Sequence, residues 1–257
     1  MRRAAALLLL ALFPNGAAAP AEQVSVYRVT GEDARLFDQY DNDGYSLAVR
    51  AAEDGTLELT VRVSDAPLRS AAPFPTGFAR DAALPSAPDR DALARRLASG
   101  SPLQAEAVEK VLLGLASRVR YDPDRLRRQD PAAVFVSGRA HCVGFAELAV
   151  DLLLRLAIPA RTVQGVLRTG AAQEGYEAAI GGAYHRWIEV YYADRGFVFS
   201  DPFSSINGVD ARYIPFTSRS LFRPGSLAIV PVAASGQLLY APVRAGEATL
   251  RVRAVSR

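Results

Sequence analysis

The chain has few of the residues that most often carry catalysis or bind metals. Its 257 residues include one cysteine, two histidines, one tryptophan and, at Lys110, one lysine. A single cysteine cannot form an intrachain disulfide, although exported chains usually carry cysteines in pairs. One cysteine and two histidines give no recognised zinc spacing, so we expect neither a metal site nor a cofactor. The absence of a Gly-x-Ser-x-Gly motif argues against a serine hydrolase.

Long apolar runs are also scarce. Residues 4–13 form an apolar stretch after two arginines, which is too short to span a bilayer as a helix. Small residues at Ala19-Pro20-Ala21 suit a cleavage site, so we predict a signal peptide over residues 1–21, with an uncleaved anchor as the alternative. No later stretch approaches about twenty apolar residues. We therefore expect an exported protein, periplasmic or extracellular, with no stable membrane span after cleavage.

Neither sign of charge dominates the chain. It carries 30 basic and 27 acidic residues, and loss of the two arginines near the start would leave the mature protein almost neutral. This balance gives no reason to expect a nucleic-acid partner. Half of the residues are hydrophobic and 22% are charged, which indicates a folded domain rather than a disordered chain.

The first part of the chain reads as β-structure followed by a linker. Residues 24–29, 45–52 and 56–63 are predicted strands, and the turn at 53–55 favours a hairpin between the last two. Five prolines within residues 66–88 rule out a sustained helix there and predict a linker or surface loop.

The middle of the chain alternates helices and strands. Helical periodicity predicts helices over 89–99, from 101 to about 120, and from Ala140 or Cys142 to Pro159. The second helix is expected to be capped by Ser101, with Pro102 at its first position and Gln104 closing a capping box. A loop of small residues is predicted at 170–182. Strands are predicted before and after it, at 160–167, 185–192, 197–200, 227–232, 237–243 and 248–255.

The lone cysteine stands where an apolar helix begins, a position that favours a thiolate because helix N-termini carry positive potential. The neighbouring His141 would not face Cys142, since adjacent side chains on a helix point apart. His185 begins a predicted strand and Asp201 ends the next, so a tight turn between them would bring the two side chains together. A thiol, an imidazole and an orienting carboxylate form the set needed for nucleophilic attack on an acyl group.

These residues and their neighbours resemble the transglutaminase-like superfamily. The segments that carry the resemblance are His141-Cys142-Val143-Gly144-Phe145-Ala146, Leu153 to Arg161, Val163-Gln164-Gly165, His185 to Val190 and Phe197 to Pro202. Two positions depart from the usual pattern. Ala157 stands where the family usually has Gly before Ile-Pro-Ala-Arg, and Ala140 stands where Gly often lies two residues before the Cys.

The resemblance implies an α+β fold with a cysteine-protease-like core, in which a helix bearing Cys142 packs on an antiparallel sheet. We expect an N-terminal β segment with the Pro-rich linker at 22–87, the core at 88–220 and a C-terminal β segment at 221–257. The implied chemistry is acyl transfer or hydrolysis at an amide bond of a protein or peptide, through Cys142, His185 and Asp201. Alternatives are a cysteine peptidase or cell-wall amidase on the same core, and a catalytically silent binding module.

Other residues near these motifs are expected to have supporting roles. Trp187 shares a strand face with His185, so it is expected in the core or in the wall of a substrate cleft. The second oxyanion donor expected from the family, besides the Cys142 N–H, could be Tyr121, Gln104 or Gln129. Arg161 is expected to be a structural ion-pair partner, and the plainer alternative for Asp201, which precedes a proline, is a turn starter.

Overall fold

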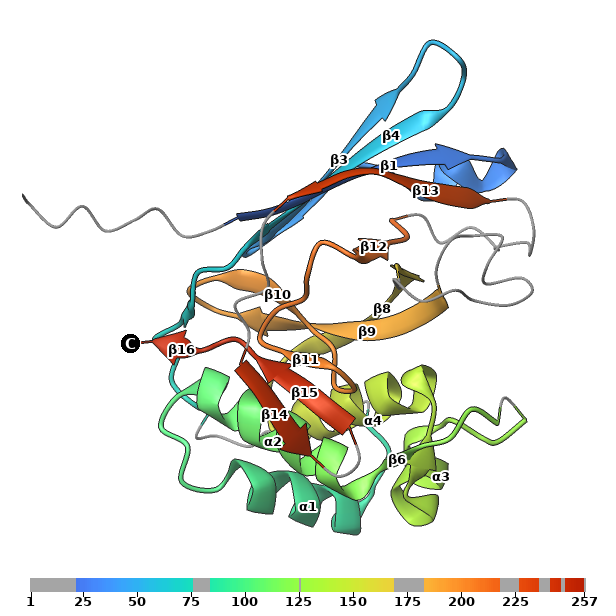
Figure 1. Ribbon diagram of the computed structural model, residues 1–257. Helices are drawn as coiled ribbons and strands as arrows, with labels where there is room; N and C mark the ends of the chain where they lie inside the picture. The colour runs from blue at the N-terminus through green and yellow to red at the C-terminus, as the bar shows by residue number, and fades with distance from the viewer. Residues whose placement is uncertain are drawn as a thin grey trace, which may run out of the picture.

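The chain folds into two stacked sheets with helices beneath the second (Figure 1). The computed structural model describes residues 22–75, 84–124, 126–168, 183–217, 227–235, 241–245 and 248–256. One hydrophobic cluster lies between the two sheets, and another lies between the second sheet and the helices. The expected α+β class is confirmed.

The first sheet has five antiparallel strands. Their order is β13 (Ala228–Ser235), β1 (Glu22–Thr30), β4 (Leu57–Ser64), β3 (Tyr45–Ala51) and β2 (Tyr40–Asn42), and the 3-10 helix η1 (Glu32–Leu36) follows β1. The hairpin predicted from the turn at 53–55 is confirmed by pairing of β3 with β4. Because β13 pairs with β1, strands from the segments predicted as N-terminal and C-terminal share one sheet. The proposed domain bounds stay predictions.

The second sheet lies between the first sheet and the helices. Its order is β10 (Gly196–Ser200), β9 (Ala183–Tyr192), β8 (Ala160–Leu167) and β12 (Tyr213–Pro215), all antiparallel. Alternate side chains of β9 enter different clusters, as strand geometry requires. Ile188 and Val190 pack toward the helices, whereas Trp187 packs toward the first sheet.

Four helices form the remaining layer: α1 (Pro88–Ala98), α2 (Gln104–Arg118), α3 (Pro131–Ser137) and α4 (Cys142–Leu154). The positions predicted to be buried on α2 are fully buried or nearly so; they are Val108, Val111, Leu112 and Leu115. The periodic pattern therefore located the helical core correctly.

The predicted cap of α2 is wrong. The helix begins at Gln104, and Ser101 makes no capping bond; Leu103 occupies the cap position. Leu103 is instead extended and bridges to Pro73 in the Pro-rich segment, with Gln104 N–H donating to Ala72 O at 2.9 Å and Phe74 N–H donating to Pro102 O at 3.0 Å. Tertiary pairing thus overrides the local capping pattern.

Helix α4 also ends before the predicted Pro159. Its last helical residue is Leu154, and Ala157 adopts the left-handed conformation with φ 56°. The Ile158 N–H then returns to Leu153 O at 3.0 Å, which closes the helix before β8 starts. This is the position where the related family usually has glycine, the residue that adopts this conformation most readily.

Short strands complete the fold. They are β11 (Ser205–Ile206), β15 (Ala248–Val252) and β14 (Ala241–Ala245) in one sheet, β16 (Val255–Ser256) with β5 (Leu68–Arg69), and β6 (Arg120–Tyr121) with β7 (Arg139–Ala140). The predicted signal peptide and the loop at 170–182 lie outside the described residues, as does part of the predicted strand at 237–243. In the part of the chain that the structure describes, no helix is both long and apolar enough to cross a bilayer.

Candidate functional site

Cys142 is the first residue of α4, and His141 occupies the N-cap. His141 Nδ1 accepts a hydrogen bond from Val143 N–H at 3.3 Å, and His141 N–H donates to Gln129 Oε1 at 3.1 Å. His141 therefore caps α4 through a local hydrogen bond. The same bonds fix the backbone that presents Cys142 at the positive end of the helix.

His185 lies near the start of β9, directly opposite Gly165 of β8. Its side chain is only 8% exposed, and its Nε2 lies 2.6 Å from Asp201 Oδ2. Since Nε2 is occupied by the carboxylate, Nδ1 is the ring nitrogen left for Cys142. His185 and the Arg186 N–H lie close enough to Cys142 for both to lower the pKa of its thiol.

The electrostatics of this group favour a charged pair. Burial opposes ionisation of Cys142, but the hydrogen bond and charge of His185 hold the pKa of the thiol below its usual value. Burial likewise opposes protonation of His185, but Asp201 and Cys142 outweigh it and raise its pKa to about 10. Both shifts run in the direction that favours a thiolate beside an imidazolium.

Asp201 is fully buried at the end of β10 and accepts more hydrogen bonds than the sequence suggested. Its Oδ2 accepts from Ser204 Oγ and from Tyr213 OH, each at 2.7 Å, besides the contact with His185. Its Oδ1 accepts from Phe203 N–H at 2.9 Å, which is the turn-starting bond considered as the plainer role. Asp201 thus both starts the turn and contacts His185.

Ser204 and Tyr213 were missed by sequence reasoning. Ser204 could have been found, because a serine three residues after an aspartate in a turn often reaches back to it. Tyr213 carries no such signal, since it belongs to β12 and approaches from the other edge of the sheet.

Trp187 is fully buried and offers no surface to a substrate in the described structure. Its ring stacks on His185 with 6.1 Å between ring centroids and meets Tyr213 edge-on at 5.3 Å. Gly165 admits this ring, because a Cβ there would lie 2.6 Å from Trp187 Cη2 and 2.1 Å from Ile214 O. The structure therefore gives Trp187 a packing role beneath the histidine, and nothing supports its predicted contact with substrate.

Two of the three candidate oxyanion donors are already engaged elsewhere. Gln104 Nε2 donates to Tyr191 O at 2.6 Å, at the far end of β9. Gln129 accepts from His141 N–H and donates to Arg127 O at 3.2 Å. Tyr121 pairs through its backbone with Ala140, is 52% exposed and lies with its ring 5.0 Å from that of Phe203.

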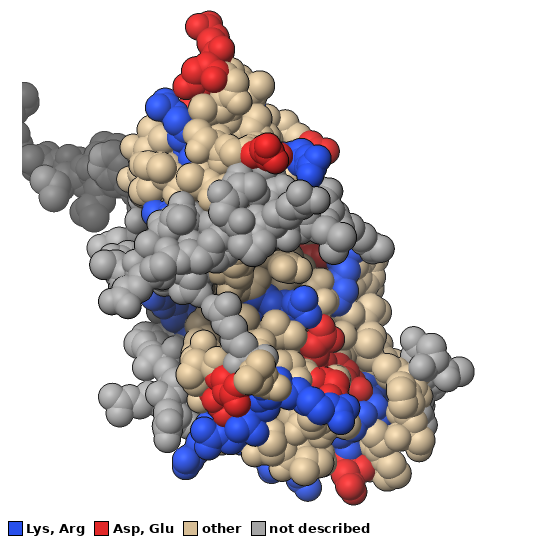
Figure 2. All heavy atoms as spheres, turned by 90° about the vertical axis from the view of Figure 1, so that its right-hand side faces the viewer, with Lys and Arg blue, Asp and Glu red and all other residues tan. Residues whose placement is uncertain are grey.

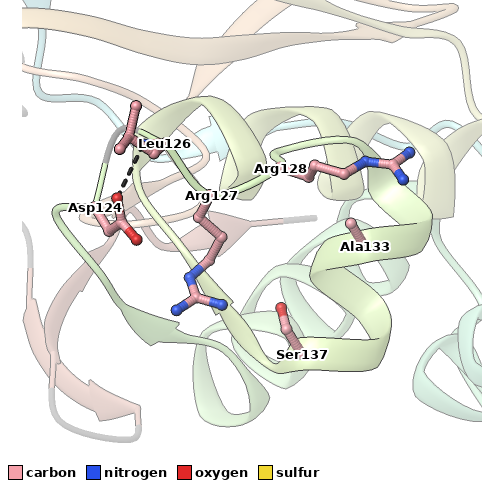
Figure 3. A pocket seen from close by; sticks show the side chains of 6 residues that line it. All are labelled: Asp124, Leu126, Arg127, Arg128, Ala133 and Ser137. Atoms are coloured by element: carbon pink, nitrogen blue, oxygen red, sulfur yellow. Dashed lines mark hydrogen bonds between the residues drawn. The ribbon is translucent and has the colours of Figure 1, made fainter.

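A hollow of about 320 Å³ lies beside the loop that precedes α3. Its lining, shown in Figure 3, consists of Asp124, Leu126, Arg127, Arg128, Ala133 and Ser137. Arg127 pairs with Asp122 at 2.8 Å and Arg128 with Asp130 at 3.0 Å, so both guanidiniums already have carboxylate partners. The face of the molecule on this side carries both signs of charge intermixed (Figure 2). We assign no ligand to this hollow.

Metal ligands do not gather at the site. Among the described residues, no group of three or more His, Cys, Asp or Glu side chains is placed to hold a metal ion. The chemistry available at the site is that of a thiol, an imidazole and a carboxylate.

Comparison with known proteins gives a family match that covers these three side chains. Residues 91–202 match the family model described as the transglutaminase-like superfamily. No curated protein shows significant similarity to the chain.

Three solved structures are similar to the chain at low identity. A candidate cysteine protease from Cytophaga hutchinsonii is 12% identical with a TM-score of 0.45, covering 85% of this chain and 90% of that one. The periplasmic domain of TgpA from Pseudomonas aeruginosa is 16% identical with a TM-score of 0.36, covering 73% and 88%. A candidate protease from Parabacteroides distasonis is 13% identical with a TM-score of 0.36, covering 85% and 46%, so the chain spans about half of that protein's length.

The family assignment rests on the match to the family model, because these structural likenesses are weak. The matched segment contains Cys142, His185 and Asp201. Residues 91–202, which carry the candidate site, are therefore similar in sequence to the transglutaminase-like superfamily.

Proposed function

We propose that this protein is a cysteine enzyme that acts on amide bonds, with Cys142 as nucleophile, His185 as general base and acid, and Asp201 as the residue that orients His185. The observation that carries the proposal is the position of the buried His185 ring, whose Nε2 lies 2.6 Å from Asp201 Oδ2 and which lies close enough to Cys142 to lower the pKa of its thiol. A buried imidazole held between a thiol and a carboxylate is the arrangement that nucleophilic catalysis requires.

The reaction would proceed through a thioester. The Cys142 thiolate attacks the amide carbonyl carbon, the C–N bond breaks, and the imidazolium of His185 gives its proton to the departing nitrogen. Water or an amine then attacks the thioester while His185 takes a proton from it, and the bond to sulfur breaks to restore the thiolate. The Cys142 N–H at the start of α4 would stabilise the developing oxyanion.

The substrate would be a protein or peptide that presents a glutamine, asparagine or peptide amide, including cell-wall peptides. We also propose that the protein acts outside the cytoplasm, in the periplasm or the medium. The predicted signal peptide supports this location. An intact Met1 on protein recovered outside the cell would contradict cleavage.

Product analysis tests the proposed function and separates its alternatives. The purified protein is incubated with casein and dansylcadaverine, and amine incorporation, ammonia release and new amino termini are measured, with Cys142→Ala as the control. Incorporated amine indicates acyl transfer, ammonia alone indicates deamidation, and new amino termini indicate a peptidase. A protein that gives no product and whose Cys142 reacts no faster than a free thiol would be a silent module, and the proposal would be wrong.

A further inference from the structure

Three short contacts meet at one oxygen of the buried Asp201. Ser204 Oγ and Tyr213 OH each lie 2.7 Å from Asp201 Oδ2, and the two hydroxyl oxygens lie 2.7 Å from each other. The hydrogen bonds described for the two hydroxyls run to Asp201 and to each other. Their effect on Cys142 therefore passes through Asp201 and His185.

Counting hydrogens shows that these contacts are redundant. An ionised carboxylate has no hydrogen to offer, so the two hydroxyl hydrogens serve three oxygen–oxygen contacts. Both hydroxyls can donate to Asp201 Oδ2, or one can donate to Oδ2 while the other donates to that hydroxyl. In every arrangement Oδ2 keeps at least one hydroxyl donor, and loss of either hydroxyl leaves the other free to donate.

The two hydroxyls reach Asp201 from independent segments. Ser204 lies in the turn that follows Asp201, whereas Tyr213 lies on β12. The first sheet holds the chain around β12 in place, since Tyr45 OH donates to Tyr213 O and Tyr27 OH donates to Ala211 O, each at 2.7 Å. Burial, together with the nearby Asp201 charge, raises the pKa of Tyr213 well above its usual value, so its hydroxyl keeps its hydrogen.

We infer that Ser204 and Tyr213 form a two-hydroxyl clamp that keeps the Asp201 carboxylate ionised and fixed against His185, with either hydroxyl able to replace the other. Both are positioning residues, and the inference rests on the proposed function because it concerns the same triad. Each hydrogen bond to a buried charged group contributes appreciably to keeping it charged, so loss of both donors raises the proton affinity of Asp201.

The test compares Ser204→Ala, Tyr213→Phe and the double variant by the pH dependence of Cys142 alkylation with iodoacetamide. Each single variant should slow alkylation less than about threefold, and the double variant at least about thirtyfold, with its acid limb about one pH unit higher. Tyr192→Phe is the control, because it removes a buried tyrosine hydroxyl that bonds to Asn207 Oδ1 and contacts neither Asp201 nor Tyr213. It should lower thermal stability and leave the acid limb in place.

A second readout separates failure of the clamp from failure of the proposed function. Since the chain has only two histidines, the His185 ring can be followed by NMR, with His141→Gln for assignment. The low-pH inflection of the His185 signal, which reports protonation of Asp201, should move upward in the double variant even if no substrate is ever turned over. Additive effects of the two substitutions, or an unmoved inflection in the double variant, would overturn the clamp. Should the double variant fail to fold, a shift of the full one pH unit in either single variant would overturn it as well.

Discussion

The hairpin of β9 and β10 buries one carboxylate at the site and another farther along, and the two behave in opposite ways. Asp201 is 0% exposed and Glu189 is 1% exposed. Asp201 contacts His185 and accepts from Ser204, Tyr213 and the Phe203 N–H. Glu189 has two partners, Arg161 at 2.7 Å and Asn42 at 3.2 Å, and the side chain of Arg161 is 57% exposed.

Their pKa values move in opposite directions for this reason. Burial alone would raise the pKa of Asp201, but the His185 charge and the hydrogen bonds around it hold that pKa below its usual value. Burial raises the pKa of Glu189 to about 7. Burial of a carboxylate therefore does not fix its charge; the donors around it decide whether it stays ionised.

The largest expected difference between the two carboxylates is in activity. Asp201→Asn should lower turnover at least about tenfold, because the charge that holds the His185 imidazolium is lost and the wrong ring tautomer can form. Glu189→Gln is the matched substitution at the other carboxylate and should leave turnover unchanged. Steady-state kinetics on the two variants measures this difference. Equal losses of turnover in both variants would contradict the distinction between Asp201 and Glu189.

The second expected difference is in packing against β8. Gly165 pairs with His185 at the site end, whereas Arg161 pairs with Glu189 at the other. Gly165→Ala should destabilise the protein by ~1–3 kcal/mol, since the added methyl group would overlap Ile214 O and the Trp187 ring. Chemical denaturation measures this loss. Gln164→Ala, which alters the exposed neighbouring side chain, is the control and should unfold like the unchanged protein.

A pH-dependent stability difference should appear at Glu189. Its folded pKa lies above its usual value, so ionisation of Glu189 costs stability that grows as pH rises from about 5 to about 8. Glu189→Gln cannot ionise, so its melting temperature should rise relative to the unchanged protein across that range. The His185 contribution, which is lost toward pH 10, is common to both proteins and cancels in the difference. A constant difference across the range would show that Arg161 neutralises Glu189 fully.

The smallest expected effect lies in the turn that leads into β8. Ala157→Gly should stabilise the protein by up to about 1 kcal/mol, because glycine adopts a φ of 56° without the steric cost that alanine bears. Thermal unfolding measures the gain. A loss of stability would mean that the flexibility glycine adds to the unfolded chain outweighs the relieved strain.

Sequence patterns predicted the elements of the core well, because periodic apolar residues directly reflect burial. The hairpin of β3 and β4, the strand β8 and the buried face of α2 all follow from local composition. The capping pattern at Ser101 gave a wrong helix start. The pairing of this segment with Ala72 and Phe74 is a contact between distant segments, which the local pattern does not encode.

The site shows the same contrast between features that local sequence patterns predict and features that depend on contacts between distant segments. The order of Cys142, His185 and Asp201 along the chain and the turn between β9 and β10 predicted that His185 and Asp201 would meet. The register adds a detail that the sequence could not supply: Ser200 pairs with Ile188, so Asp201 reaches His185 diagonally and not from directly opposite. The donation from Tyr213 depends on how β12 pairs with β8, which no local pattern encodes.

The rate of Cys142 alkylation at pH 6–7 tests the central claim most directly. Since Cys142 is the only cysteine, iodoacetamide labels a single site, and its rate can be compared with that of a free thiol and with the His185→Ala variant. The pair with His185 predicts faster alkylation than a free thiol in the unchanged protein and loss of that advantage in the variant, because only the thiolate reacts. Equal rates in the two proteins would contradict the charged Cys142–His185 pair and the mechanism built on it.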